Sequence, residues 1–350
     1  MIDDSESGFL SDSPGDDVDA ESGTAVAEQP QLDQIPKDSH VVVTGAAGLV
    51  GAHLCRQLVN AGWKVRGIVR DTAKAAARIG DLRLEIREAD IRDAGAMRSA
   101  LAGAGALVHL AAIAIEKSGE SYEATNTDAT RVILDAAKSS GVDRIVYMSQ
   151  NGASSSSRYR FLKSKGVAED MVVNSGLRWT VLKPSVIFGP EDEFVNVLAR
   201  LVRLSPFVFP LPGGGAARFQ PIAVDDVARV VVKCLDDGST VRETYVIGGS
   251  TPLTLREMTE RILVAMNTSR ALVKMPVSAL RPMIAVAEKL LPRPPVTTGL
   301  LDLLEMDNVV PQNDLTSKLG INPIPFAPEE LLYLRQITVS SAFRSLFKSN

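Results

Sequence analysis

The feature that most constrains the fold is a glycine-rich turn between a short apolar strand and a helix. Residues 41–51 read Val-Val-Val-Thr-Gly-Ala-Ala-Gly-Leu-Val-Gly, so three glycines spaced three residues apart follow a β-branched run. Gly45 allows the tight turn, Gly48 lets the backbone approach a pyrophosphate, and Gly51 lets the helix pack against the strand. Because amide groups at a helix start attract phosphates, the turn, Ala47 included, predicts a dinucleotide site. The alternative is a tight turn that is purely structural.

Strand and helix patterns alternate without interruption from this turn to about residue 185. The further expected strands are 64–70, 82–89, 106–112, 144–149 and 179–184. This alternation predicts an α/β fold with a doubly wound, Rossmann-type parallel sheet. We therefore expect a dinucleotide-binding domain at 39–185. A smaller C-terminal α/β substrate or cap region, 186–350, would return some segments to the main sheet.

Three local patterns mark the connections and the second region. Ser154–Ser157 is a serine run, which is typical of a flexible loop. Residues 206–215 are rich in Pro and Gly and are expected to form a substrate-side lid. Thr254 with Glu257 three residues later predicts a helix that starts with a capping box.

The N-terminal segment differs in composition from the rest. Residues 1–36 hold ten acidic residues and no Lys or Arg. They also have few large apolar residues, so we expect 1–38 to be a disordered acidic tail that keeps the chain soluble or binds a partner. Since the net charge is −4, the remainder is only mildly basic, and 5% of all residues are aromatic. A nucleic-acid surface is therefore not predicted.

Cysteine usage and hydropathy bear on the compartment. Cys55 and Cys234 lie far apart in apolar helical patterns, and no secretory signal precedes the first strand. A cytoplasmic location is expected. No apolar run reaches the roughly 18 residues of a transmembrane helix, although peripheral membrane or protein-complex association stays open. An apolar helix at 279–291 either packs on the second region or touches a membrane surface.

The ends of two expected strands bear on the cofactor. An acidic residue after the second strand accepts the ribose hydroxyls of NAD, whereas an Arg there accommodates the 2′-phosphate of NADP. Here Arg70 and Asp71 stand together. We favour NADP(H) over NAD(H), with Arg70 on the phosphate; the alternative pairs an exposed Arg70 with a neighbouring carboxylate. Ala111 and Ala112 end the fourth strand, where small side chains suit either a bound cofactor or an ordinary core.

Several stretches resemble the extended or atypical short-chain dehydrogenase/reductase family, whose members include NAD-dependent epimerases and dehydratases. They are 44–51, Asp90-Ile91, 109–112, 165–169 and 183–190, and the resemblance extends over residues 40 to about 250. Residues 220–228 and 315–321 are similar to the branch that contains the nucleotide-binding accessory subunit of respiratory complex I.

The resemblance implies roles for particular residues. Gly45, Gly48, Leu49 and Val50 would cradle the pyrophosphate. Asp90 and Ile91 would hold the adenine, Pro184 and Val186 would border the nicotinamide, and the family's lysine would hold the nicotinamide ribose. No metal site is implied, and the substrate is a small molecule of unknown identity.

Family chemistry uses a Tyr, a Lys four residues later on the same helix face, and a Ser or Thr after the fifth strand. Tyr159 and Lys163 have the spacing outright. However, Lys165 matches the family's spacing to the following helix stop, which puts Phe161 at the Tyr position. We prefer this register, in which Asn151 falls at the Ser/Thr position.

The preferred register removes both hydroxyl groups that family chemistry needs. A phenyl ring cannot exchange a proton, and loss of a general acid or base costs on the order of 10² to 10⁴ in rate. The sequence therefore predicts an NAD(P)(H)-binding protein whose catalysis is lost or altered. The alternative is an active reductase, epimerase or dehydratase that uses Tyr159 and Lys163.

Overall fold

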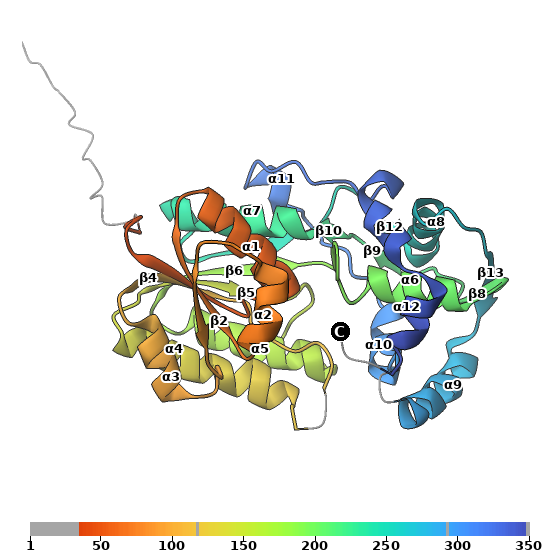
Figure 1. Ribbon diagram of the computed structural model, residues 1–350, viewed down its shortest axis with the longest axis horizontal. Coiled ribbons are helices and arrows are strands. Elements are labelled where there is room, and N and C mark those ends of the chain that lie inside the picture. The colour runs from red at the N-terminus through yellow and green to blue at the C-terminus, as the bar shows by residue number, and fades with distance from the viewer. Residues whose placement is uncertain (1–34, 117–118, 292–293, 348–350) are drawn as a thin grey trace, which may run out of the picture. The chain divides into compact units, whose positions relative to one another are not determined.

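The computed structural model describes residues 35–116, 119–291 and 294–347. The core of this part of the chain is a seven-stranded sheet in which every paired neighbour is parallel, in the spatial order β11-β6-β5-β4-β1-β2-β3 (Figure 1). Its strands are β1 (His40–Thr44), β2 (Lys64–Val69), β3 (Glu85–Glu88), β4 (Ala104–His109), β5 (Arg144–Met148), β6 (Arg178–Pro184) and β11 (Glu243–Ile247). The predicted doubly wound parallel sheet is confirmed.

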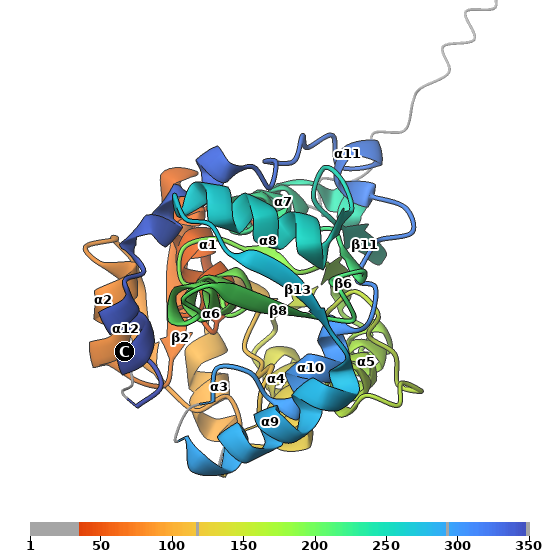
Figure 2. The ribbon, with the colours of Figure 1, turned by 90° about the vertical axis from the view of Figure 1, so that its right-hand side faces the viewer.

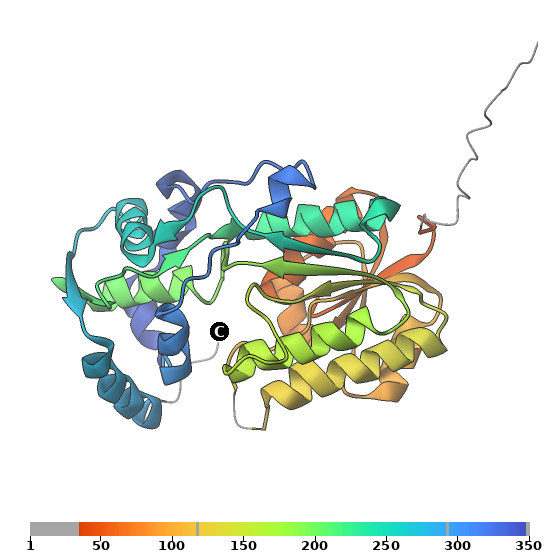
Figure 3. The same ribbon diagram turned by 180° about the vertical axis from the view of Figure 1, so that it is seen from behind.

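Helices cover both faces of the sheet. The face against α1 (Leu49–Asn60), α2 (Thr72–Ile79) and α7 (Val224–Asp236) is one apolar core, which also contains Leu54 and Val230. A second core lies under α3 (Ala94–Leu101), α4 (Ala129–Ser139) and α5 (Arg160–Val173). Figure 3 shows α7 on one side of the sheet and α4 and α5 together on the other. Because both faces are buried, β1 reads as an unbroken apolar run.

The order of the strands fixes where a ligand can bind. Thr44, the last residue of β1, pairs with Ile68 on one side and with His109 on the other. The chain reaches β2 through α1 but reaches β4 only after β3, so the winding reverses between β1 and β4. The crevice outside the carboxyl ends of the strands at such a reversal is where open α/β sheets bind ligands.

Residues beyond β6 build a third apolar core, which includes Leu198, Phe209, Met258 and Leu331. The elements that form it or pack beside it are β7 (Ile187–Phe188), α6 (Val195–Leu204), β8 (Val208–Pro212), β9 (Arg218–Phe219), β10 (Ile222–Ala223), β12 (Leu253–Thr254), α8 (Leu255–Ala265), β13 (Ala271–Met275), α9 (Val277–Leu290), α10 (Thr298–Leu304) and α12 (Val339–Arg344), together with the 3₁₀ segment η3 (Pro328–Gln336). The helix α11 (Asp314–Ser317) packs instead on β11, and the 3₁₀ segment η2 (Gly238–Thr240) packs on α7. Strand β11 leaves this region and joins the main sheet beside β6.

One connection differs from the expectation, the serine run is a loop as expected, and one local pattern is confirmed. The Pro/Gly stretch 206–215 contains strand β8, which pairs in parallel with β13 some 60 residues later (Figure 2). The serine run packs against helix α5, because a Cβ on Gly166 would lie 2.1 Å from the carbonyl carbon of Ser154. Thr254 and Glu257 form the predicted capping box. The pairing of β8 with β13 depends on a partner distant in sequence, which no local pattern shows.

Most of the expected acidic tail, 1–38, lies outside the described residues, which begin at position 35. Of its last residues, Ile35 is buried, and Lys37 donates a 2.6 Å hydrogen bond to Asp236. The Lys37 ammonium also lies 3.5 Å from the centre of the Trp63 ring. Residues 35–37 are thus attached to α7 and to the start of β2.

Candidate dinucleotide site

The glycine turn after β1 is tightly packed. Gly45 has a φ of +70°, and a Cβ there would lie 3.0 Å from the amide nitrogen of Ala111. Gly51 is more confined, since a Cβ would lie 2.1 Å from the carbonyl oxygen of Gly45. Gly48 caps α1, and a Cβ there would meet only that same oxygen, at 3.1 Å. Gly45 and Gly51 therefore permit the local fold, while Gly48 leaves room beside the helix start.

A pocket of about 310 Å³ opens beside this turn, at the carboxyl ends of β1, β2, β3 and β4. The expected cofactor residues that line it are Gly45, Ala47, Gly48, Arg70, Asp90, Ile91, Ala111 and Ala112. Leu49 and Val50 follow Gly48 in the first turn of α1 and are half-buried. The pocket thus joins four strand ends to one helix start, which suits the adenosine and phosphate half of a dinucleotide.

Charged side chains alternate in sign around the pocket. Arg70 pairs with Glu120. Two guanidinium nitrogens of Arg92 donate hydrogen bonds to the Asp90 carboxylate, at 2.6 and 3.0 Å. The hydrogen bonds from Arg92 hold the pKa of the Asp90 carboxyl below its usual range. Neither Arg92 nor Glu120 was among the expected site residues. Arg92 could have been found from the sequence, because it stands two positions after Asp90. No local pattern points to Glu120.

A buried polar chain supports the turn from behind. The Oγ1 atom of Thr44 lies 2.8 Å from Nδ1 of His109, and Nε2 of His109 lies 3.1 Å from Oγ1 of Thr130. Burial lowers the pKa of His109 to about 3, so the imidazole is neutral at pH 7. The Ala111 amide also donates to Thr44. His109 thus ties β1 to α4 as a structural residue.

Lys165 lies on α5 and does not line this pocket. Its side chain is only 4% exposed, and Nζ donates a 2.6 Å hydrogen bond to the carbonyl oxygen of Met148 at the end of β5. Burial lowers the pKa of this ammonium to about 7. Phe161 stands one helical turn earlier, with its ring 5.7 Å from the ring of Tyr122. No hydroxyl group accompanies Lys165 at the Phe161 position.

Tyr159 and Lys163 lie elsewhere on this helix. Tyr159 caps the start of α5, and its hydroxyl accepts a 2.6 Å hydrogen bond from Arg158. Lys163 is exposed, whereas Lys165 is buried. Because two residues correspond to about 200° of helical rotation, these two lysines leave α5 in nearly opposite directions.

Asn151, at the position of the family's Ser or Thr, contacts the C-terminal region. Its Nδ2 donates to Oδ1 of Asn308 at 2.8 Å and to the carbonyl oxygen of Val309 at 3.2 Å. The main-chain N–H of Asn151 also donates to the carbonyl oxygen of Pro184 at 2.9 Å. Pro184 is buried at the end of β6, and Val186 is partly buried against the third core, that of the residues beyond β6. Neither lines the pocket beside the glycine turn.

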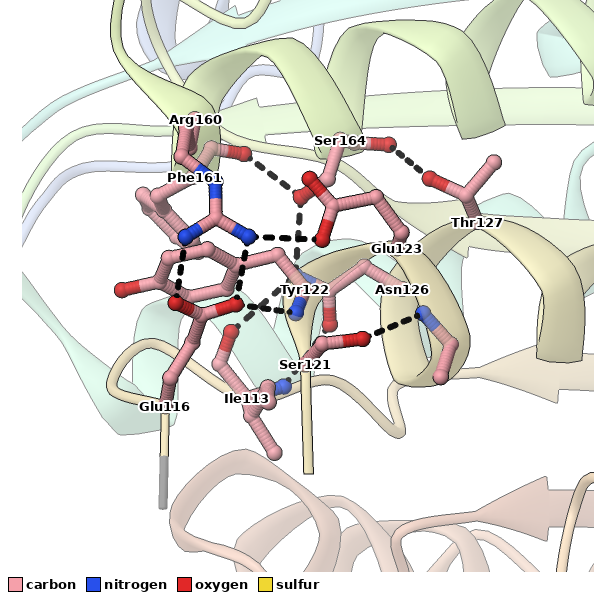
Figure 4. A network of polar contacts seen from close by, with 11 residues as sticks. Ile113, Glu116, Ser121, Tyr122, Glu123, Asn126, Thr127, Arg160, Phe161 and Ser164 are labelled. Carbon is pink, nitrogen blue, oxygen red and sulfur yellow. Dashed lines mark hydrogen bonds and ion pairs between the residues drawn. The ribbon is translucent and has the colours of Figure 1, made fainter. Parts of the chain in front are cut away.

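A polar network lies beside Phe161 at the start of α5 (Figure 4). Arg160 grips Glu116 at 2.7 and 2.9 Å and also reaches Glu123. Glu116 lies in the segment after β4, and Glu123 begins the π-helical turn η1 (Glu123–Asp128), which continues directly into α4. Asn126 in that turn accepts from the amide of Ile113 and donates to its carbonyl oxygen. The network holds the segment after β4 against the start of α5.

The fold and the pocket define a dinucleotide-binding protein of the Rossmann type. A family model for NAD(P)H binding matches residues 45–238, and the chain belongs to that family. It is 30% identical over 273 residues to the mitochondrial NADH dehydrogenase [ubiquinone] 1 alpha subcomplex subunit 9 of Arabidopsis thaliana, covering 76% of this chain and 68% of that one. It is 31% identical over 236 residues to sterol demethylase protein B of Methylococcus capsulatus, covering 59% and 69%.

Solved structures confirm the fold. A dTDP-glucose 4,6-dehydratase from Streptomyces venezuelae, with NAD and TYD bound, superposes with a TM-score of 0.65 at 24% identity, covering 85% of this chain and 96% of that one. A UDP-glucuronic acid 4-epimerase from Bacillus cereus gives 0.66 at 18%, covering 85% and 99%. These structures confirm the fold that the resemblance implied. Among the described residues, no helix is long and apolar enough to span a membrane.

Proposed function

We propose that this chain binds NADP(H) in preference to NAD(H) and holds it without hydride transfer, as a nucleotide-bound subunit of a larger protein assembly. The observation that carries the proposal is the surroundings of Lys165. This lysine is buried at the end of β5. The residue one turn before it is Phe161, and the nearby Tyr159 hydroxyl is bound by Arg158 at the helix start.

The preference for NADP(H) is supported by the cations around the pocket. Arg70, Lys74 and Arg92 all line it. A 2′-phosphate carries about two negative charges near pH 7, and a guanidinium binds phosphate through a planar pair of N–H groups. The acidic residue that would serve NAD, Asp71, accepts a hydrogen bond from the Lys74 amide as the cap of α2. That carboxylate is therefore already used by the fold.

The proposed membership in an assembly is supported by the relatives. Besides the Arabidopsis protein, the mitochondrial NADH-ubiquinone oxidoreductase 40 kDa subunit of Neurospora crassa is 25% identical, covering 84% of this chain and 78% of that one. Both are named as subunits of an NADH dehydrogenase. Another relative, a ceramide reductase of Caulobacter vibrioides at 31% identity, is named as an enzyme, so turnover is the property that must be tested.

The test is direct binding of NADPH and NADH to the full chain by calorimetry, followed by a turnover assay on a panel of carbonyl compounds and nucleotide sugars. We expect tighter binding of NADPH and no turnover. Gly48→Val should abolish binding without unfolding the chain, because a side chain there fills the pocket and meets only the Gly45 oxygen. Gly299→Val is the matched control, since a Cβ at Gly299 has no neighbour closer than 4.0 Å.

Reproducible turnover on any compound would overturn the non-catalytic part of the proposal. The matched variants Tyr159→Phe and Phe161→Tyr then identify the source. If Tyr159→Phe removes the activity, proton transfer is assigned to Tyr159 and Lys163. Equal affinity for the two dinucleotides, or tighter NADH binding, would overturn the NADP(H) preference.

A further inference from the structure

Among the carboxylates that line the pocket, that of Glu120 pairs with a cation far away in the sequence. Two of the three cations pair with acids close by in sequence: Arg92 with Asp90, two positions away, and Lys74 with Asp71, three positions away. Arg70 instead pairs with Glu120, 50 positions further along the chain. Glu120 comes from the segment after β4, while Arg70 directly follows β2. The pair thus forms only when the sheet brings β2 and β4 to the same crevice.

The two partners are placed differently with respect to solvent. The Arg70 side chain is 62% exposed, whereas the Glu120 side chain is 21% exposed, and both line the pocket. The Glu120 carboxylate is therefore the more fixed of the two, and the flexible guanidinium reaches toward it. A ligand that enters the pocket meets an Arg70 that already has an anionic partner.

The charges around this pair influence one another. Arg70 contributes to the lowered pKa of Asp90, and Glu120 contributes to the raised pKa of Arg92. Arg70, Glu120, Asp90 and Arg92 therefore form one group of four charges with no net charge. Removing a single carboxylate would leave this group with one uncompensated positive charge.

We propose that Glu120 occupies the place of the 2′-phosphate of NADP(H) on Arg70, so that it acts as an internal competitor and lowers the preference for NADP(H) over NAD(H). This inference rests on the proposed function of the pocket. Carboxylate and phosphate bind a guanidinium through the same planar pair of N–H groups, so they cannot share it fully. A bound 2′-phosphate must displace Glu120 from Arg70 and then lies near a like charge.

NAD(H) meets a different situation at the same place. Its ribose carries a neutral 2′-hydroxyl, which does not compete for the guanidinium and which can donate a hydrogen bond to a carboxylate. The Arg70–Glu120 pair therefore persists when NAD(H) binds. Arg70 favours NADP(H) and Glu120 favours NAD(H). The ratio of the two affinities therefore measures the combined effect of the two side chains.

The experiment measures the dissociation constants of NADPH and NADH for the full chain and for Glu120→Gln, which keeps the size of the side chain and removes its charge. We expect NADPH to bind about fivefold tighter to the variant, the change that corresponds to the upper end for an exposed ion pair, and NADH to bind no tighter than before. Glu123→Gln is the matched control. It removes the same charge from a carboxylate that pairs with Arg160 and does not line the pocket.

A second pair of variants tests whether Arg70 is the intermediary. In an Arg70→Ala background, Glu120→Gln should change the NADPH affinity much less, because the competitor has lost the group for which it competes. A shift in the NADPH-to-NADH ratio that appears with Glu120→Gln, but not with Glu123→Gln, supports the inference. An unchanged ratio, or an equal shift in both variants, overturns it and leaves the proposed function standing. If the unmodified chain binds neither dinucleotide, the proposed function fails and this inference fails with it.

Discussion

The ammonium group of Lys165 donates a 2.6 Å hydrogen bond to the main-chain oxygen of Met148, which fixes the middle of α5 to the end of β5. The Nζ atom also lies 4.6 Å from the centre of the Tyr147 ring. The aromatic face stabilises a positive charge, but burial without a paired carboxylate costs more, so the pKa is lowered. The residue one helical turn before Lys165 is Phe161, so the helix itself brings no hydroxyl group to this ammonium.

The lowered pKa of Lys165 predicts how stability depends on pH. In the unfolded chain the lysine has its ordinary pKa of 10.5, and in the folded chain the pKa is about 7. Between these values the unfolded chain binds more protons, so the lysine's contribution to the free energy of unfolding rises with pH and is flat below about pH 7. Denaturant unfolding of the unmodified chain and of Lys165→Met between pH 7 and pH 9 checks this. The stability difference between the two should move in favour of the unmodified chain as pH rises; a constant difference would contradict the assignment.

A second prediction concerns the half-buried ion pair beside Lys165. Glu169 accepts from Ser149 at 2.5 Å and from Lys183 at 2.7 Å, and the Glu169 and Lys183 side chains are about one-sixth exposed. Glu169→Ala leaves the ammonium of Lys183 and the Ser149 hydroxyl without this partner, so we expect a loss of about 3 kcal/mol, the lower end for a broken buried pair. Chemical denaturation measures it. Glu260→Ala, which removes an exposed carboxylate 4.0 Å from Arg256, should cost far less.

Asn151 is predicted to hold the C-terminal segment rather than to assist catalysis. Asn151→Ala removes the hydrogen bonds to Asn308 and Val309, so amide hydrogen exchange in residues 306–312 should become faster. Asn174→Ala is the control, since that amide bonds only to Asp170 in its own helix. Asn151→Ser should resemble Asn151→Ala, because the shorter side chain does not reach Asn308. Unchanged exchange in all three variants would show that the segment is held by other contacts.

The contact between α5 and the serine run predicts a strong effect of a small change. Gly166→Ala places a methyl group 2.1 Å from the carbonyl carbon of Ser154 and 2.4 Å from the amide nitrogen of Ser155. The loop backbone must move, and we expect a loss of about 1–3 kcal/mol. Gly299→Ala, in an open position on α10, should not destabilise the chain. Thermal unfolding of the two alanine variants compares them, and equal midpoints would mean that the serine run is not packed on α5.

Features that depend on residues close together in the sequence were predictable, whereas features that depend on residues far apart in the sequence were not. The apolar strand, the glycine turn and the helix that follows it were predicted, because strand period, helix period and glycine conformations are local properties. Strands β5 and β6 followed equally well from their apolar runs. The spacing of Phe161 to Lys165 was also readable, since four residues make about one helical turn.

The sheet, the glycine turn and the spacing of Phe161 to Lys165 thus follow from the sequence. The tertiary structure alone decided that β8 pairs with β13, that Asn151 bonds to Asn308, and that Arg70 meets Glu120. The sequence had left Arg70 with two roles, a phosphate ligand or one half of an ion pair. Its carboxylate partner comes from a segment 50 residues away, and no local pattern marks Glu120 for it. Only the folding of β2 and β4 into one sheet brings these two charges together, because hydrogen-bond and ion-pair partners far apart in sequence are selected by packing.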